Sequence, residues 1–166
     1  MRLLLSMAED IRVVFIMIAR QLQLMRDAKD AERSRQLDLS VESTYLYAPL
    51  AHRLGLYTIK SELEDLSLKY TDRESYDFIA KKLNETKRSR DQYIREFIEP
   101  LKERLDKSGL KYDIKGRTKS IHSIFNKLKK QKIEFENIYD LFAIRVILDA
   151  PADQEKAQCW QVYSIV

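Results

Sequence analysis

The spacing of apolar residues changes at Gly109, and this change restricts the folds that the sequence can form. Before Gly109, apolar residues recur every three to four positions, as in helices that bury one face. After it, LKYDIK at 110–115 alternates and LFAIRVIL at 141–148 is rich in β-branched residues, so both indicate strands. Between them, TKSIHSIFNKLKKQ at 118–131 has helical spacing. The sequence therefore predicts a mostly helical α+β fold, with helices first and a strand–helix–strand–helix segment after them.

Four helices are expected before Gly109. The first has apolar residues on several faces, which predicts that it is buried nearly all round. Thr71 and Glu74 have the spacing of a capping box, and Pro100 predicts a kink in the last helix, with Gly109 as its end. Pro151 is expected to start a further helix near the end of the chain. The four helices are expected over about residues 1–28, 36–53, 57–69 and 71–107, with a break near 84–86.

Composition excludes some classes of protein. No apolar run approaches the ~20 residues that a membrane-spanning helix needs, so no membrane partner is expected. Cys159 is the single cysteine, which rules out an internal disulfide and suits a reducing, cytoplasmic location.

The positive charge of the chain is concentrated in one segment. Residues 111–132 contain eight Lys or Arg and one acid, a net charge of +7, whereas the whole chain has a net charge of +4. A concentrated basic patch favours a specific site for an anion over general binding of polyanions.

The basic segment and the strand after it have features of a phosphate site. Arg117 and Lys119 are expected at the start of a helix, where N–H groups and the helix dipole favour an anion. Ser123 and Lys127 follow Lys119 at steps of four, so the three would line one face. An ordinary solvated basic face is the alternative interpretation.

The strand after the basic helix adds an acid and a further cation. Asp140 precedes the apolar strand and Arg145 lies within it, where a charge is costly unless it has a partner or ligand. A carboxylate facing several cations predicts a site for Mg²⁺ and a polyphosphate.

These residues carry a resemblance to a known family. KGRTKSIHSIFNKLKK at 115–130, followed by IYDLFAIRV at 138–146, resembles the synthetase motif of the RelA/SpoT family, whose members make the alarmone (p)ppGpp. YAPLAHRLGLYTIKSELEDLSLKY at 47–70 resembles the helical signature that precedes this motif, and SMAEDIRVVFIMIARQLQLMR at 6–26 extends the likeness. The resemblance implies three parts: the last helices of an HD-type hydrolase domain, linking helices, and the start of an incomplete nucleotidyltransferase-like synthetase domain. Their expected ranges are residues 1–70, 71–109 and 110–166.

The resemblance also implies an activity and the roles of individual residues. The family moves the β,γ-pyrophosphate of ATP to the 3′-hydroxyl of GDP or GTP, as a GTP pyrophosphokinase of the stringent response. Arg117 and Arg145 would hold the adenine between their guanidinium planes. Asp140 would bind Mg²⁺ and be the catalytic carboxylate, and His122 is expected to be a packing or surface residue. The ATP phosphates would be held by Lys119, Ser123 and Lys127.

Two departures from the family pattern limit these expectations. The family's second carboxylate and its guanine-stacking tyrosine are expected in segments after Val166, so this chain by itself is expected to be inactive. In the hydrolase part, the family segment similar to IKLADRLHNMR reads IMIARQLQLMR, with Arg20 at the position of a metal-binding Asp and Leu24 at that of a functional Asn. A cation cannot replace an anionic metal ligand, so hydrolase activity is not expected. Ribosome association would need regions outside this chain.

Two rival functions remain open from the sequence. Tyr112 and Phe125 near the basic patch would suit stacking of bases in a nucleic-acid-binding module. Residues 1–109 could instead be a helical regulatory or interaction module. Separately, the apolar helix expected over 1–28 predicts self-association into a homo-oligomer, since an exposed apolar patch tends to be covered.

Overall fold

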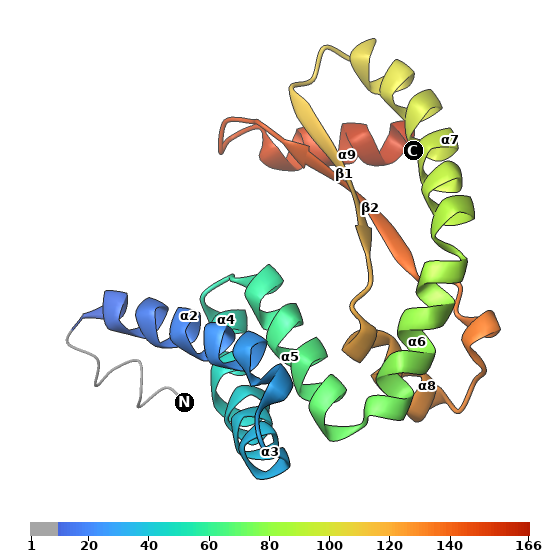
Figure 1. The fold of residues 1–166 in the computed structure, drawn as a ribbon. Coiled ribbons are helices and arrows are strands. Elements are labelled where there is room, and N and C mark those ends of the chain that lie inside the picture. The colour runs from blue at the N-terminus through green and yellow to red at the C-terminus, as the bar shows by residue number, and fades with distance from the viewer. Residues whose placement is uncertain (1–9) are drawn as a thin grey trace. The chain divides into compact units, whose positions relative to one another are not determined.

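The computed structural model describes residues 10–166, which divide into two compact units. One unit contains the chain up to Lys81 together with Ser120–Phe135, and the other contains Lys82–Lys119 together with Glu136–Val166. Helices dominate, and the strands form a single antiparallel pair in the described part of the chain (Figure 1). This confirms the predicted α+β fold, mostly helical. None of the helices in the described range is long and apolar enough to cross a membrane.

Helix α2, Ile11–Asp27, is the described part of the first expected helix, and residues 1–9 lie outside the described range. The Asp10 side chain caps its N-terminus by accepting a hydrogen bond from the backbone N–H of Arg12 at 2.9 Å. The expectation of burial nearly all round was wrong, because the helix buries one face only. Ile16 on the opposite side is 67% exposed. The buried face consists of Val14, Ile18, Gln21, Leu22 and Met25.

Self-association through this helix stays a prediction. The apolar residues on its exposed side are Ile11, Val13, Phe15, Ile16 and Met17. Ile16 is the suitable position for a test, because Ile18 is fully buried and a charge there would disrupt the fold itself. A lower sedimentation coefficient for Ile16→Glu than for the wild-type chain would support association. Identical monomeric values would contradict it.

A π-helical turn interrupts the second helical stretch. Helix α3, Arg33–Glu42, passes through η2, Ser43–Tyr47, into α4, Ala48–Arg53. Pro49 stands in the first turn of α4, where its missing N–H is tolerated. Gly55 has φ +74° just after α4, a left-handed conformation that suits glycine and marks the predicted end of the stretch. The short 3₁₀ helix η1, Ala28–Asp30, joins α2 to α3.

The core of the first unit lies where α5, Tyr57–Thr71, packs on α2, α3 and α4. Leu63 is fully buried, and the Tyr70 hydroxyl donates to the Met25 carbonyl at 2.9 Å, so an apolar contact and a buried hydrogen bond both fix α5. Gln21 of α2 donates to the Leu39 carbonyl at 3.2 Å and the Ser43 hydroxyl at 3.1 Å. These contacts give buried polar groups the partners they need.

The predicted capping box at Thr71 was wrong. Thr71 lies inside α5, and its hydroxyl donates to the Ser67 carbonyl at 2.8 Å. The next helix, α6, covers Arg73–Glu85, and Asp72 accepts from the backbone N–H of Ser75 at 3.1 Å. Asp72 therefore takes the capping role one residue later, because a carboxylate also serves as an N-cap.

The second unit consists of a long helix, one further helix and an antiparallel pair of strands. Helix α7, Lys87–Asp106, contains Pro100, and the break before it falls at Thr86, within the predicted interval. Gly109 follows α7 with φ +70°, as expected for a helix-terminating glycine. Helix α9, Glu155–Ile165, begins four residues after Pro151 rather than at it.

Strands β1, Tyr112–Thr118, and β2, Phe142–Leu148, pair antiparallel from Tyr112 opposite Leu148 to Thr118 opposite Phe142. This strand pair is called the hairpin below, although helix α8, Ile121–Gln131, lies between the two strands in the chain. One face of the pair packs on α7: the Phe142 ring lies 5.5 Å from the ring of Tyr93. A Cβ atom at Gly116 would meet Ile94 of α7 at 3.1 Å, so the absence of a side chain permits this close approach. The opposite face is exposed, and it carries the charged residues.

Candidate functional site

Lys119 and Asp140 meet at one end of the hairpin. The backbone N–H of Lys119 donates to the Leu141 carbonyl at 2.8 Å, which continues the strand ladder past Thr118. This bond holds the two segments together, and the Lys119 ammonium lies 2.6 Å from an oxygen of Asp140. The Asp140 side chain is 53% exposed, so the carboxylate also faces solvent. The pair is therefore formed by the hairpin itself and stays accessible to a ligand.

Arg117 and Arg145 lie on the exposed face of the same hairpin. Arg117 is opposite Ala143, and Arg145 is opposite Lys115, so the two arginines are diagonal neighbours on one face. The sequence interpretation of Arg145 as a charge inside a buried strand was wrong, because alternate residues of the strand are only half-buried and Arg145 is exposed. No desolvation cost therefore demands a ligand there. The arrangement nevertheless brings two guanidinium groups to one open surface.

Helix α8, Ile121–Gln131, begins later than the sequence predicted. Arg117 lies in β1 and Lys119 in the connection after it, so neither stands in the helix, and Lys119 does not share a helical face with Ser123 and Lys127. Ser120 is the N-cap: its hydroxyl accepts from the Ser123 backbone N–H at 3.3 Å. The predicted face is thus reduced to Ser123 and Lys127, which lie one turn apart on α8.

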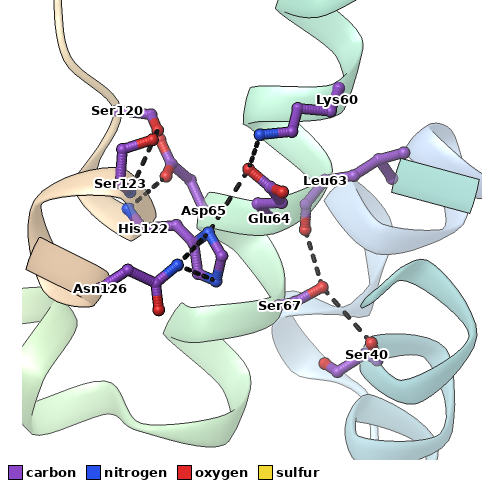
Figure 2. Close-up of polar contacts among 10 residues, drawn as sticks. All are labelled: Ser40, Lys60, Leu63, Glu64, Asp65, Ser67, Ser120, His122, Ser123 and Asn126. Atoms are coloured by element: carbon purple, nitrogen blue, oxygen red, sulfur yellow. Dashed lines mark hydrogen bonds and ion pairs between the residues drawn. The ribbon is translucent and has the colours of Figure 1, made fainter. Parts of the chain in front are cut away.

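A carboxylate from another helix already occupies the N-terminus of α8. The backbone N–H of His122 donates to Asp65 of α5 at 2.8 Å (Figure 2). Burial raises the pKa of Asp65, while hydrogen bonds from the His122 and Ile121 backbones oppose this rise. The expectation that these N–H groups await an external anion was wrong, because Asp65 supplies the negative charge that the helix dipole favours.

Glu64, next to Asp65, forms a second link to α8. One of its oxygens lies 2.7 Å from the Lys60 ammonium and 3.4 Å from the His122 ring nitrogen Nδ1. Burial raises the pKa of Glu64, but hydrogen bonds to His122 and Lys60 together outweigh it, so the net pKa is lowered. Asn126 of α8 lies 3.3 Å from both His122 ring nitrogens (Figure 2). The His122 ring therefore lies among polar partners.

Sequence reasoning missed these two acids, although a signal was present. In SELEDL at 61–66, Glu64 and Asp65 stand between the inward residues Leu63 and Leu66 of the expected helix. Adjacent carboxylates so close to a buried face need partners. The partner segment could not be read from the sequence, because α8 is far from α5 along the chain.

The six residues predicted for the site fall in both compact units. The hairpin unit brings Lys119 and Asp140 together, with the two arginines on one face. Helix α8 belongs to the other unit. The residues in the hairpin unit are Arg117, Lys119, Asp140 and Arg145, and those on α8 are Ser123 and Lys127.

Comparison with known protein families gives two matches in the order that the motifs suggested. Residues 1–57 match the HD domain family, and residues 116–166 match the region found in RelA / SpoT proteins. The second match covers the end of β1 and all of α8, β2 and α9. The chain belongs to the RelA/SpoT family.

Curated relatives match nearly the whole chain. A GTP pyrophosphokinase of Escherichia coli strain K12 is 36% identical over 165 residues, which is 99% of this chain and 22% of the relative. One from Myxococcus xanthus is 37% identical over 146 residues, covering 88% of this chain and 19% of the relative. A guanosine-3′,5′-bis(diphosphate) 3′-pyrophosphohydrolase of Aquifex aeolicus is 30% identical over 166 residues, covering 99% of this chain and 23% of the relative. The chain thus spans about a fifth of the length of these relatives.

Proposed function

We propose that this chain supplies part of a (p)ppGpp synthetase, which transfers the β,γ-pyrophosphate of ATP to the 3′-hydroxyl of GDP or GTP. The observation that carries the proposal is the hairpin: the Lys119–Asp140 pair at its end and two arginines on one exposed face. The similarity to GTP pyrophosphokinases of Escherichia coli and Myxococcus xanthus supports it.

The basic residues of the chain have separate proposed roles in binding ATP. Arg117 and Arg145 would take the adenine between their guanidinium planes, for which their diagonal position on one face is suited. Lys119 and Lys127 would neutralise phosphate oxygens, and the Ser123 hydroxyl would donate a hydrogen bond to them. Such transfer relies on positioning and charge neutralisation more than on covalent catalysis by the protein.

Asp140 would hold Mg²⁺. No group of three or more His, Cys, Asp or Glu side chains that could hold a metal ion occurs within residues 10–166. A single half-exposed carboxylate still fits Mg²⁺, which commonly binds one or two carboxylates together with substrate phosphates and water. When bound, the ion would supply charge neutralisation at the phosphates. Lys119 would then pass from Asp140 to the phosphate oxygens, keeping its charge compensated.

The chemistry needs no further reactant. The 3′-hydroxyl oxygen of GDP or GTP forms a bond to the β-phosphorus of ATP and releases its proton to water. The bond from that phosphorus to the bridging oxygen of the α-phosphate breaks, and AMP leaves. The role proposed for Lys119, Ser123 and Lys127 is to hold the phosphates in line for this displacement.

The remaining parts of the chain carry proposals of their own. Residues 1–70 would belong to an HD-type hydrolase domain, 71–109 to linking helices and 110–166 to the synthetase domain. We do not expect hydrolysis of (p)ppGpp, because Arg20 and Leu24 occupy the positions of two functional residues of the hydrolase domain. Arg20 lies on the exposed side of α2, and Leu24 packs against the core cluster. Neither side chain can serve as an anionic metal ligand.

The test compares two carboxylates of the same hairpin. Because the chain spans about a fifth of its relatives' length, transfer is assayed in a protein extended to their length. Asp140→Asn should lower synthesis from ATP and GDP by ~10²-fold or more, on the scale of other losses of a positioned catalytic group. Asp113→Asn is the matched control, since Asp113 also pairs with a lysine, Lys115, at 2.9 Å. Equal rates for wild type and Asp140→Asn would overturn the proposal.

A further inference from the structure

The contact of α5 with α8 bears on the proposed phosphate residues, because α8 carries both Ser123 and Lys127. We propose that Asp65 and Glu64 of α5 are positioning residues for the Ser123 and Lys127 side chains. The core helices would thereby determine how strongly α8 binds phosphate. This inference rests on the proposed function.

The first step is the orientation of Ser123. The Ser120 hydroxyl accepts from the Ser123 backbone N–H at 3.3 Å and donates to the Ser123 hydroxyl oxygen at 2.8 Å (Figure 2). The Ser123 hydroxyl thereby keeps its own proton as a donor, which a phosphate oxygen can accept. The direction of the Ser123 hydroxyl depends on the first turn of α8. A contact that fixes this turn therefore also fixes the Ser123 hydroxyl.

The second step is the anchor of that turn. Asp65 accepts the His122 backbone N–H at 2.8 Å, and Asp65 belongs to α5 rather than to α8. A helix normally finds its cap in the residue just before it. Here Ser120 and Asp65 share the task, and the share of Asp65 ties the turn to a second helix. With these N–H groups taken, phosphate would be bound by side chains of α8 and not by its N-terminus.

The third step is the angle of α8 about that anchor. The His122 ring lies 3.4 Å from Glu64, and Lys60 holds the same Glu64 oxygen at 2.7 Å. Two adjacent α5 carboxylates therefore contact two different parts of His122, its backbone and its ring. A backbone contact with a ring contact restrains rotation of α8 as well as its distance from α5.

The fourth step is the connection of α5 to the core. Ser67, one turn after Glu64 and Leu63, donates to the Leu63 carbonyl at 2.7 Å and approaches the Ser40 carbonyl of α3 at 3.5 Å (Figure 2). Leu63 is fully buried against the helices of the first unit. A shift of α5 in that core would therefore move the carboxylates that hold α8.

The experiment uses the 166-residue chain, two variants of Asp65 and one control. Asp65→Ala removes the acceptor, whereas Asp65→Asn keeps one acceptor oxygen. Glu62→Ala is the control, because Glu62 is an acid of the same helix that pairs with Arg26 of α2 at 2.6 Å. Hydrogen exchange of the 120–128 amides reports the anchor, and Kd values for magnesium ATP and for magnesium tripolyphosphate report the ligands.

Asp65→Ala should speed exchange of the His122 amide about five- to tenfold, the scale of a lost helix cap. It should weaken binding of both phosphate probes by a similar factor. Asp65→Asn should have a smaller effect on the exchange rate and on both Kd values, and Glu62→Ala should change none of them. Faster exchange with unchanged Kd values would overturn the positioning role, and so would unchanged exchange. If the wild-type chain binds neither probe, or if Lys127→Ala leaves both Kd values unchanged, the proposed function fails instead.

Discussion

Helix α8 and the β1–β2 hairpin both supply residues proposed to bind ATP, but they hold them in opposite ways. The first turn of α8 is fixed by carboxylates of α5, and Ile124 on its inner side is fully buried. The hairpin half-buries residues on one face and leaves Arg117 and Arg145 exposed on the other. The position of α8 is thus fixed by packing within the fold, whereas the charged side chains of the hairpin are exposed to solvent. Substitutions in the core should therefore affect the structure of α8 more than that of the hairpin arginines.

The largest expected effect separates the core from the open face. Leu63→Ala, at a fully buried position, should lower the free energy of unfolding by ~2–5 kcal/mol. Ile147→Ala, at a position 43% exposed on the charged face of β2, should change it by no more than ~0.5 kcal/mol. Urea unfolding followed by circular dichroism measures both values. Similar losses for the two variants would break the contrast.

A smaller effect is expected at the arginines. Arg117→Ala and Arg145→Ala should each weaken ATP binding by ~1–3 kcal/mol, the usual range for loss of stacking on a base. The melting temperature should stay that of the wild type, because both side chains are exposed. Lys115→Ala, on the same face and paired with Asp113, is the control by isothermal titration calorimetry. Equal losses for all three variants would indicate general charge attraction instead of stacking.

The smallest effect is a pH dependence at the α5–α8 contact. Burial raises the pKa of Asp65, so its contribution favours the folded state below its unfolded pKa and is lost as pH rises through the folded pKa. The pKa of Glu64 is lowered, so its contribution is present above its unfolded pKa and is lost as pH falls through the folded one. Relative to Asp65→Asn, the wild type should lose stability as pH rises above the ordinary Asp pKa of about 3.9, whereas relative to Glu64→Gln it should gain stability as pH rises towards the ordinary Glu pKa of about 4.3. Denaturant titrations across this range measure both differences, and slopes of the same sign would contradict the assignment.

The sequence predicted the elements better than their ends. Helical spacing located the helices, and the left-handed glycines at Gly55 and Gly109 marked two ends, because these depend on local residues only. Thr71 and Asp72 both can cap a helix, and spacing alone could not choose between them. The start of α8 was predicted too early, because Thr118, Lys119 and Ser120 suit the end of a strand as well as the start of a helix. In the structure, Thr118 pairs with Phe142 and ends β1.

The residue types of the proposed site could be chosen from the sequence, whereas their surroundings could not. The pairing of Lys119 with Asp140 follows from the strand register, which the sequence suggested only by placing an acid before the second strand. The Asp65 cap and the Glu64–His122 contact depend on two helices that meet after long separation in the chain. No periodicity reports such a meeting. Residue types thus carry the chemistry, whereas tertiary contacts decide which groups remain available to a ligand.

The central claim is that the basic hairpin binds ATP with Mg²⁺ through Asp140, and one binding measurement tests it directly. ATP binding to the 166-residue chain is measured with Mg²⁺ and with EDTA, in wild type and Asp140→Asn, and in competition with a single-stranded oligonucleotide. The account predicts binding that needs Mg²⁺, is lost in Asp140→Asn and resists the oligonucleotide. Tight oligonucleotide binding that falls steeply with salt and ignores Mg²⁺ would contradict it and indicate a nucleic-acid-binding module.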